Sequence, residues 1–338
     1  MICVKSLMMK YLKKLVVLVL AATLCFSLAA CADASNEPIT VEDYGEDFTT
    51  LPLTDNGYEL EEIVIEIPGL TEEYNLLLVA DLHIIEIDNG VEFGQKSSLK
   101  NRIKAFSLDN GKTTSSDLWE AMPIYLDACN ADAILFAGDM VDFSSESNNR
   151  TLLNGLEKLK TPYLLVKADH DTEPFVLNDK GMKTYDMYQD QIGNSEALFY
   201  SDLGEVVIIC VNYSTTNLPD SAVETLREAV AIGKPIIILT HVPFYSEVDN
   251  SLQEMSEDDF GGRALVWSGY GNTDYYPGTD AQWELMTLIY TDDNPVREVL
   301  CGHLHFSWDG SITNYVDQHV FSPAFEKKIG YIRICGSK

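Results

Sequence analysis

The sequence predicts an α/β fold with mixed sheets, because short apolar runs of strand length alternate with segments of helical spacing. The ends of these apolar runs carry most of the histidines. Five of the six histidines lie in four short stretches at or just beyond such an end, and two of the four stretches also hold an aspartate. Because ligands of α/β sheets bind at the carboxyl ends of the strands, we expect these side chains to meet in one site.

The first half of the chain supplies strands and helices in alternation. Apolar runs predict strands at 63–65, 76–80, 133–137 and 163–166. Residues 117–130 and 151–160 have the spacing of amphipathic helices; in the first of them Leu118, Met122, Tyr125 and Leu126 share one face. The segment 86–116 is polar and contains glycine, so we expect an insertion that lies over the site.

The second half continues the alternation. Strands are predicted at 206–211, 235–239 and 296–300, helices at 221–231 and 281–290, and closing antiparallel strands at 311–320 and 329–335. Residues 244–280 show little regular pattern, and loops of that length in compact domains are usually functional. Since no internal repeat and no Pro/Gly-rich linker divides the chain, residues 56–338 are predicted to form one domain.

The first thirty residues have the layout of a secretory signal peptide. Lysines precede an almost uncharged apolar stretch, 15–28, which is too short to span a bilayer comfortably. The sequence Leu28-Ala29-Ala30-Cys31 resembles the lipobox of bacterial lipoproteins, in which the cysteine is lipidated. Simple cleavage beside an incidental cysteine remains the alternative. We expect an extracytoplasmic protein that is anchored to a bacterial membrane through Cys31, with residues 31–55 as an acidic flexible tether.

Charge and cysteine content fit an exported domain. Removal of the four lysines of residues 1–30 changes the formal net charge from −30 to −34, a surface that repels nucleic-acid backbones. We therefore expect no nucleic-acid partner. The mature domain keeps Cys129, Cys210, Cys301 and Cys335 without a C-x-x-C pair. They are predicted to be small buried hydrophobic side chains, although export also permits a disulfide.

The residues at the strand ends form a set of metal ligands. Imidazole and carboxylate together bind divalent metals such as Mn, Fe or Zn. Two such ions clamp the attacking and leaving oxygens of a phosphoryl displacement, and they convert a shared water into hydroxide near neutral pH. The candidate ligands are Asp81, His83, Asp139, Asp169, His241, His303 and His305. His170 is the additional histidine, available for proton or charge work on the leaving group.

In their order along the chain these motifs resemble those of the calcineurin-like metallophosphoesterase superfamily. The pattern D-x-H, G-D-x-x-D, G-N-H-[DE], H and G-H-x-H is matched over about residues 76 to 306. The resemblance implies two packed mixed β-sheets flanked by helices, in a four-layer sandwich. It also implies a dinuclear site in which Asp81, His83 and His305 hold one metal, Asp169, His241 and His303 hold the other, and Asp139 bridges.

The resemblance further implies the chemistry. His170 becomes the leaving-group acid, oriented by Asp142, and a metal-bound hydroxide attacks a small phosphate ester, a phosphodiester in preference to a phosphomonoester. Asp142 stands where purple acid phosphatases have a ligating tyrosine, and Phe143-Ser144 where protein Ser/Thr phosphatases have Arg-Gly. The chain is therefore expected to resemble the broad bacterial phosphodiesterase-type branch.

The motif around His170 departs from the family pattern. Ala168-Asp169-His170 stands where the family has Gly-Asn-His. The aspartate can still ligate a metal, but its extra negative charge weakens the attraction for an anionic phosphate and favours a harder metal. A second hypothesis therefore stays open, namely a non-catalytic binding module that retains metal and is anchored at the cell surface. Turnover of nitrophenyl esters by the metal-loaded protein distinguishes the two.

Overall fold

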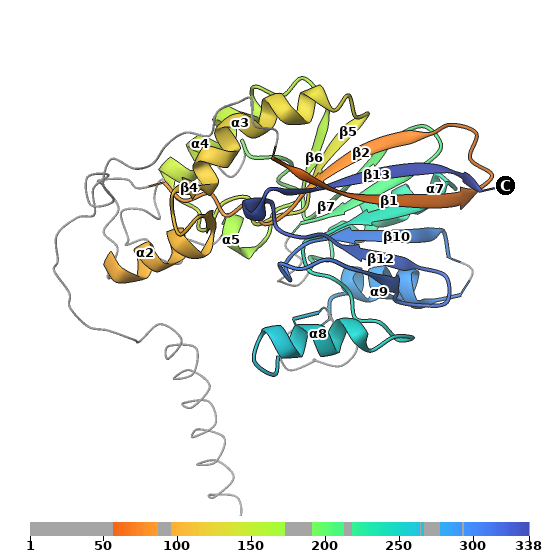
Figure 1. Ribbon diagram of the computed structural model, residues 1–338. Coiled ribbons are helices and arrows are strands. Elements are labelled where there is room, and N and C mark those ends of the chain that lie inside the picture. Colours follow the sequence, from red (N-terminus) through yellow and green to blue (C-terminus); the bar gives the residue numbers. More distant parts are fainter. Residues whose placement is uncertain are drawn as a thin grey trace, which may run out of the picture.

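The computed structural model describes residues 57–86, 96–172, 191–212, 218–263, 265–266, 278–292 and 294–337. Two mixed β-sheets pack together, with helices on their outer faces (Figure 1). This confirms the predicted α/β fold and its layers. The predicted signal peptide 1–30, the tether 31–55 and Cys31 lie outside the described residues. Among the helices of the described part, none combines the length and the apolar character that a membrane span requires.

The first sheet has five strands. In spatial order they are β1 (Glu59–Pro68), β13 (Lys328–Ser337), β2 (Tyr74–Val79), β5 (Ala133–Phe136) and β6 (Tyr163–Leu165). β13 runs parallel to β1 and antiparallel to β2, whereas β2, β5 and β6 are parallel to one another. Its outer face is covered by α3 (Ser115–Ala128) and α4 (Glu146–Leu156). These helices touch where α4 has Gly155, because a Cβ there would come within 2.1 Å of the Trp119 indole.

The second sheet has six strands. In spatial order they are β11 (Trp308–Ser311), β12 (Asp317–Val320), β10 (Val296–Cys301), β9 (Ile236–Leu239), β8 (Val207–Val211) and β7 (Leu198–Asp202). The four from β12 to β8 are parallel, and an antiparallel strand closes each edge. Its outer face packs against α7 (Ala222–Ala231), α8 (Ser251–Asp259) and α9 (Asp280–Tyr290).

Four inner strands, β2, β5, β8 and β9, are almost entirely apolar because both of their faces are buried. In β2, Leu76 and Leu78 point into the core between the sheets, whereas Leu77 and Val79 point toward the helices. In β8, Ile208 faces the same central core and the alternate side chains face the outer helices. This two-residue alternation with both faces covered explains the continuous apolar runs of the sequence. Packing against both faces also fixes the ends of these strands at one edge of the sheets.

Some elements differ from the prediction. The polar insertion 86–116 contains α2 (Lys96–Ala105) and a small hairpin of β3 (Ser107–Leu108) and β4 (Thr113–Thr114), and the expected loop 244–280 contains α8. The two closing segments do not pair with each other: β12 belongs to the second sheet and β13 to the first. The apolar side chains of β12 and β13 are buried in different parts of the core, and a local sequence pattern does not show to which sheet a strand belongs.

The four cysteines of the domain are free thiols. Cys210 and Cys301 are fully buried within strands, as predicted, and Cys129 and Cys335 are half-buried. They serve as small side chains that fill the packed layers.

Candidate metal centre

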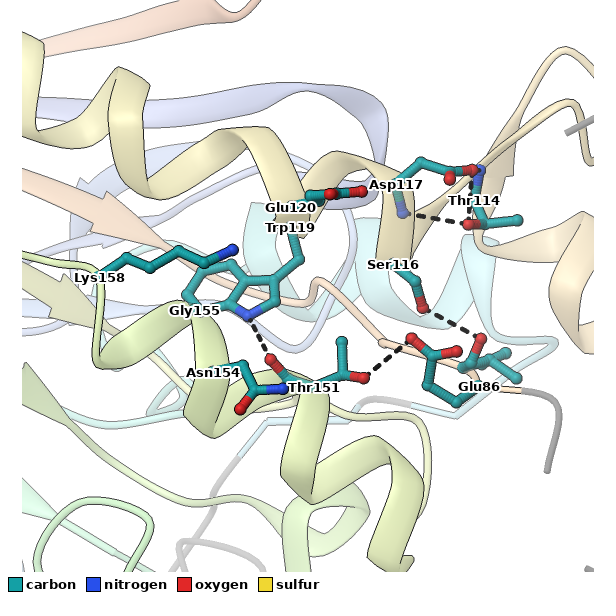
Figure 2. Close-up of a pocket in the computed structure, with 11 residues that line it drawn as sticks. Glu86, Thr114, Ser116, Asp117, Trp119, Glu120, Thr151, Asn154, Gly155 and Lys158 are labelled. Atoms are coloured by element: carbon teal, nitrogen blue, oxygen red, sulfur yellow. Dashed lines mark hydrogen bonds between the residues drawn. The ribbon is translucent and has the colours of Figure 1, made fainter. Parts of the chain in front are cut away.

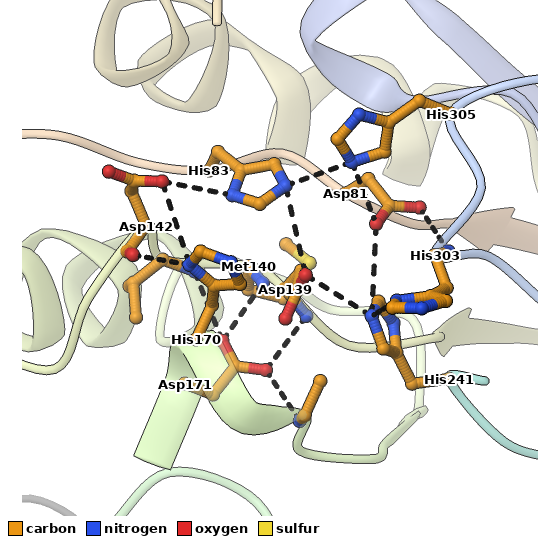
Figure 3. A network of polar contacts seen from close by, with 12 residues as sticks. Asp81, His83, Asp139, Met140, Asp142, His170, Asp171, His241, His303 and His305 are labelled. Carbon is orange, nitrogen blue, oxygen red and sulfur yellow. Dashed lines mark hydrogen bonds and ion pairs between the residues drawn. The ribbon is translucent and has the colours of Figure 1, made fainter. Parts of the chain in front are cut away.

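The predicted site residues follow the carboxyl ends of five strands, and the sheets bring these ends together. Asp81 and His83 follow β2, Asp139 follows β5, and His241 follows β9. The remaining residues come from two further connections: Asp169 and His170 begin the short helix α5 (Asp169–Thr172) after β6, and His303 and His305 follow β10. Figure 3 shows the side chains from these separate segments pointing toward one another.

The backbone of this region is held in an unusual conformation. Asp81, His83, Asp139, His303 and His305 all have left-handed φ angles, between +50° and +76°. Such angles cost free energy for residues with a side chain, and they persist only where the surroundings impose them. Left-handed backbone at five predicted ligands indicates that the fold holds them for a purpose other than stability.

Hydrogen bonds join these loops to one another. The N–H of Asp81 donates to the carbonyl of Gly138 at 3.1 Å, and that of Gly302 donates to the carbonyl of His241 at 3.1 Å. The N–H of His303 donates to the Asp81 carboxylate at 2.9 Å. Gly302 has no side chain because a Cβ would lie 2.4 Å from Oδ2 of Asp81. The glycine of the G-H-x-H motif thus allows two ligand loops to approach closely.

A first group of donors consists of Asp81, His83 and His305, whose ligand atoms all lie within 4.8 Å of one another. Nε2 of His83 lies 3.2 Å from Nε2 of His305. Nε2 of His305 lies 3.5 Å from Oδ1 of Asp81. Two nitrogens and one carboxylate oxygen therefore surround one position.

A second group consists of Asp139, His241 and His303. Nε2 of His241 lies 3.1 Å from Oδ2 of Asp139 and 3.1 Å from Nδ1 of His303. Nδ1 of His241 lies 2.8 Å from the carbonyl of Ala137, to which it donates when Nε2 is left for a metal. Oδ2 of Asp139 also lies 3.7 Å from Nε2 of His83, so this oxygen adjoins both groups. That is the position expected of a bridging carboxylate.

These donors fit a pair of divalent cations. Oδ1 of Asp81, Asp139 and Asp169 is in each case buried without a hydrogen-bond partner. Native proteins rarely leave buried polar atoms unpaired, and carboxylate oxygen with imidazole nitrogen is a common ligand set for Mn, Fe and Zn. Asp169 lies outside both groups of described donors, so its role as a ligand remains a prediction.

The buried carboxylates and imidazoles of the site shift one another's pKa values. Burial opposes the charge on His241, but Asp139 and Asp81 outweigh it and raise the pKa of His241 to about 10. Burial and the neighbouring His241 lower the pKa of His303 to about 3. Burial raises the pKa of Asp139, yet His241 and the other histidines hold it well below its usual range. A metal that binds here must therefore displace a proton from His241, which makes metal affinity depend on pH.

His170 lies at the rim of the centre, and its contact with Asp142 differs from the expected one. Nδ1 of His170 lies 2.6 Å from the backbone carbonyl of Asp142, whereas the Asp142 carboxylate is 3.7 Å away. The reason is that Arg102 takes both carboxylate oxygens, at 2.6 and 2.5 Å, and His83 approaches one of them. Asp142 thus orients His170 through its backbone and His83 through its side chain.

Comparison with known proteins agrees with this arrangement. The family model "Calcineurin-like phosphoesterase" matches residues 74–307, which is more than half of the chain. The chain belongs to the calcineurin-like phosphoesterase family. The protein is accordingly a metal-dependent phosphoester hydrolase. No curated protein matches the chain.

Several solved structures are similar to this phosphoesterase. A dimetal phosphatase from Danio rerio has 10% identity and a TM-score of 0.43, with 75% of this chain and 88% of that chain covered. Purple acid phosphatase PPD1 from yellow lupin (Lupinus luteus) seeds has 13% identity and a TM-score of 0.43, with 75% and 44% covered. The phosphopantetheinyl hydrolase of Mycobacterium tuberculosis has 13% identity and a TM-score of 0.34, with 74% and 89% covered.

Two side chains next to the centre of this phosphoesterase were not predicted from sequence. Arg102 and Phe106 come from α2 and the turn after it, and the Phe106 ring stacks on His83 with centroids 4.0 Å apart. The available signal is the spacing of Leu99, Ile103 and Phe106, at i, i+4 and i+7, within an otherwise polar segment. That spacing indicates a helix with one apolar side, although it says nothing of the arginine.

Asp171, adjacent to His170, has a structural role. Its buried carboxylate accepts the backbone N–H groups of Asp139, Met140, Val141 and Ala168 at 2.8 to 3.1 Å. These bonds join the loop after β5 to the start of α5 (Figure 3). They position the bridging carboxylate relative to His170.

A cavity of about 440 Å³ lies beside the centre, between α3 and α4 (Figure 2). Its lining includes Glu86, Asp117, Trp119 and Lys158, and none of the predicted site residues. A carboxylate oxygen at its edge is bound within the protein, because the Thr151 hydroxyl donates to Oε1 of Glu86 at 2.9 Å. The convergence of ligand atoms, and not the size of a cavity, therefore identifies the functional site of this phosphoesterase.

Proposed function

We propose that this phosphoesterase hydrolyses small phosphodiesters, in preference to phosphomonoesters, with two divalent ions held by the residues above. The observation that carries the proposal is the convergence of the two donor groups on either side of Asp139. When bound, such a pair of ions supplies a hydroxide nucleophile near neutral pH and draws charge away from the phosphate oxygens.

The preference for diesters follows from charge. The predicted ligands include the carboxylates of Asp81, Asp139 and Asp169, and the chain carries a formal net charge of −30. Two divalent ions are largely neutralised by three carboxylates and a hydroxide. A phosphomonoester brings nearly two negative charges at neutral pH and a diester brings one, so the diester meets less repulsion.

His170 is the proposed proton donor. Burial opposes its charge, but the carboxylates of Asp139 and Asp142 outweigh burial and raise the pKa of His170. The side chain is half-buried at the rim, where a leaving group can reach it, and the Asp142 carbonyl orients its ring. A raised pKa favours the protonated form of the imidazole, which can give its proton to the departing alkoxide or phenoxide.

The test is metal reconstitution of the purified protein. We expect the stripped protein to be inactive, and Mn, Zn or Fe to restore turnover of bis(p-nitrophenyl) phosphate more than that of p-nitrophenyl phosphate. His170→Ala should retain both ions and lose about 10²- to 10⁴-fold in kcat, the usual contribution of general acid catalysis. His319→Ala controls for the loss of a histidine outside the donor groups, on β12, and turnover is compared at a temperature where both variants are folded.

The competing function is a non-catalytic binding module that retains the metal. It predicts binding of two ions by the reconstituted protein without turnover of either ester. Wild-type turnover that is equal to that of His170→Ala would also count against the proposed role of His170, while leaving the metal centre intact.

We further propose that the protein is anchored to the outer face of a bacterial membrane through Cys31. The support is the sequence Leu28-Ala29-Ala30-Cys31 after an apolar stretch. Metabolic labelling with an alkyne fatty acid should label the wild-type chain and not Cys31→Ser. Equal labelling of both would reject lipidation at this residue.

A further inference from the structure

An ion pair joins α2 to the edge of the metal centre. Nε of Arg102 donates to Oδ2 of Asp142 at 2.6 Å, and Nη2 donates to Oδ1 at 2.5 Å. The Asp142 side chain is fully buried, and the Arg102 side chain is one-third exposed. The planar fork of an arginine matches both oxygens of a carboxylate, which is why such pairs hold their geometry well.

The same carboxylate also holds His83. Oδ1 of Asp142 lies 3.2 Å from Nδ1 of His83, on the side of the ring that faces away from the other ligands. Nε2 of His83 then faces His305 at 3.2 Å and Asp139 at 3.7 Å. The contact between Asp142 and Nδ1 of His83 has the distance of an ion pair without the geometry of a hydrogen bond. A carboxylate next to the second nitrogen of a ligating histidine favours one orientation of the ring and raises its basicity.

Helix α2 contacts His83 from a second direction. Phe106 stacks on the His83 ring at an interplanar angle of 13°, and the guanidinium of Arg102 lies 5.3 Å from the centroid of Phe106. The helix itself is docked by Leu99 and Ile103, which pack with Phe143 in a small buried cluster. Removing the charge of Arg102 therefore leaves the apolar contacts of α2 in place.

Arg102 prevents Asp142 from binding a cation together with its neighbouring histidines. His83, Asp142 and His170 lie close enough together to hold a cation themselves. With both oxygens of Asp142 bound by the guanidinium, the carboxylate is committed to Arg102 and His83. A permanently charged side chain thus stands where an additional ion would otherwise compete for His83.

We propose that Arg102 is a positioning residue of the metal centre: it binds Asp142 so that Asp142 orients His83 toward the ion shared with Asp81 and His305. The inference rests on the proposed function, because it assigns His83 to a bound ion. It adds a residue from α2 that lies outside all of the metallophosphoesterase motifs.

The test measures metal binding by the stripped full-length protein. Mn²⁺ titration by calorimetry, together with the Mn²⁺ electron paramagnetic resonance spectrum, is compared for wild type, Arg102→Met and Arg102→Lys. We expect Arg102→Met to weaken one of the two Mn²⁺ sites by about 10- to 100-fold, the usual effect of losing such a supporting residue, and to leave the other unchanged. The signal of the coupled pair should decline in favour of that of isolated Mn²⁺.

Arg102→Lys should lose less affinity than Arg102→Met, since it keeps the charge but cannot hold both oxygens. Lys104→Met is the matched control, because it removes an exposed cation from the same helix. It should bind Mn²⁺ like wild type. The melting temperature of each stripped variant shows whether α2 is still docked, and Arg102→Lys carries the test if Arg102→Met unfolds.

Wild-type affinity at both sites in Arg102→Met and Arg102→Lys would overturn the inference, as would an equal loss in Lys104→Met. A higher KM with unchanged Mn²⁺ affinity would also overturn it, because Arg102 would then serve the substrate directly. These outcomes differ from failure of the proposed function, in which wild type itself does not bind two ions.

Discussion

At the residue scale, position 169 most clearly separates this chain from its family. The aspartate there has a buried oxygen without a hydrogen-bond partner, and its charge acts on both His241 and His170. An asparagine of the same shape would present an oxygen at the same place without the charge. The substitution therefore isolates electrostatics from geometry.

We predict that Asp169→Asn retains both ions and binds inorganic phosphate more tightly. One negative charge fewer beside the substrate corresponds to an energy on the order of 1–2 kcal/mol at a partly buried site, or roughly tenfold in affinity. The inhibition constant of phosphate and the metal content by mass spectrometry check this. Asp258→Asn, on the exposed surface of α8, controls for net charge. Unchanged phosphate inhibition in Asp169→Asn would contradict the electrostatic explanation.

The site residues divide into those that the sequence predicts and those that it does not. The seven predicted ligands and His170 follow apolar runs in a fixed order, and parallel strands bring such ends together whatever lies between them. Arg102 pairs with a carboxylate forty residues away, and no local spacing encodes that pair. Asp142 lies beside His170 as the sequence predicts, but the sequence does not show that its side chain also binds Arg102 and lies beside His83.

At the scale of elements, the buried strands were the easiest to predict and the peripheral ones the hardest. β2, β5, β8 and β9 are buried on both faces, so their sequences are continuously apolar. Two helices were missed because α2 and α8 are mostly polar and bury only one side. β7 was missed because it is an edge strand with partly exposed side chains.

An ion cluster joins three strands at the edge of the second sheet. His319 on β12 lies 2.7 Å from Asp309 on β11 and 3.2 Å from Glu298 on β10. Burial opposes the charge of the imidazole, but both carboxylates outweigh burial and raise the pKa of His319 to about 9. Because the unfolded value is about 6.5, this stabilisation is fully present below pH 6.5 and is lost as the pH rises through about 9.

We predict that His319→Gln lowers the free energy of unfolding on the order of 2 kcal/mol at pH 6. In wild type, the cost of burying the charge of Glu298 offsets part of the stabilisation by the ion cluster. The difference between wild type and variant should shrink toward pH 10. Urea unfolding at pH 6 and at pH 10 measures it. A difference that is independent of pH would show that His319 acts through packing alone.

At the scale of the whole molecule, one cluster of charges lies between loops that come from both sheets. Asp81 and Asp139 are almost fully buried between segments from both sheets, beside His83 and His241. Ions that bind only the native state stabilise it by mass action. The metal centre should therefore act as a joint between the two halves of the domain.

We predict that a chelator lowers the melting temperature of the metal-loaded protein by about 10 °C. A thousandfold excess of ion over its dissociation constant contributes about 4 kcal/mol, and a domain of this size shifts by roughly 2–4 °C per kcal/mol. Differential scanning fluorimetry with and without chelator measures the shift. Asp139→Asn should show almost none, because this residue adjoins both donor groups. Equal melting temperatures of wild type in both conditions would argue against bound ions.

The pairing of the first and last strands sets the direction from which the chain enters the domain. Glu59 at the start of β1 lies opposite Lys328, and Gly330 lies opposite Leu78, just before the ligand Asp81. The domain therefore begins at its catalytic end, and β13 finishes at the other (Figure 1). A tag fused ahead of β1 would therefore lie near the metal centre, whereas one fused after β13 would lie at the opposite end of the domain.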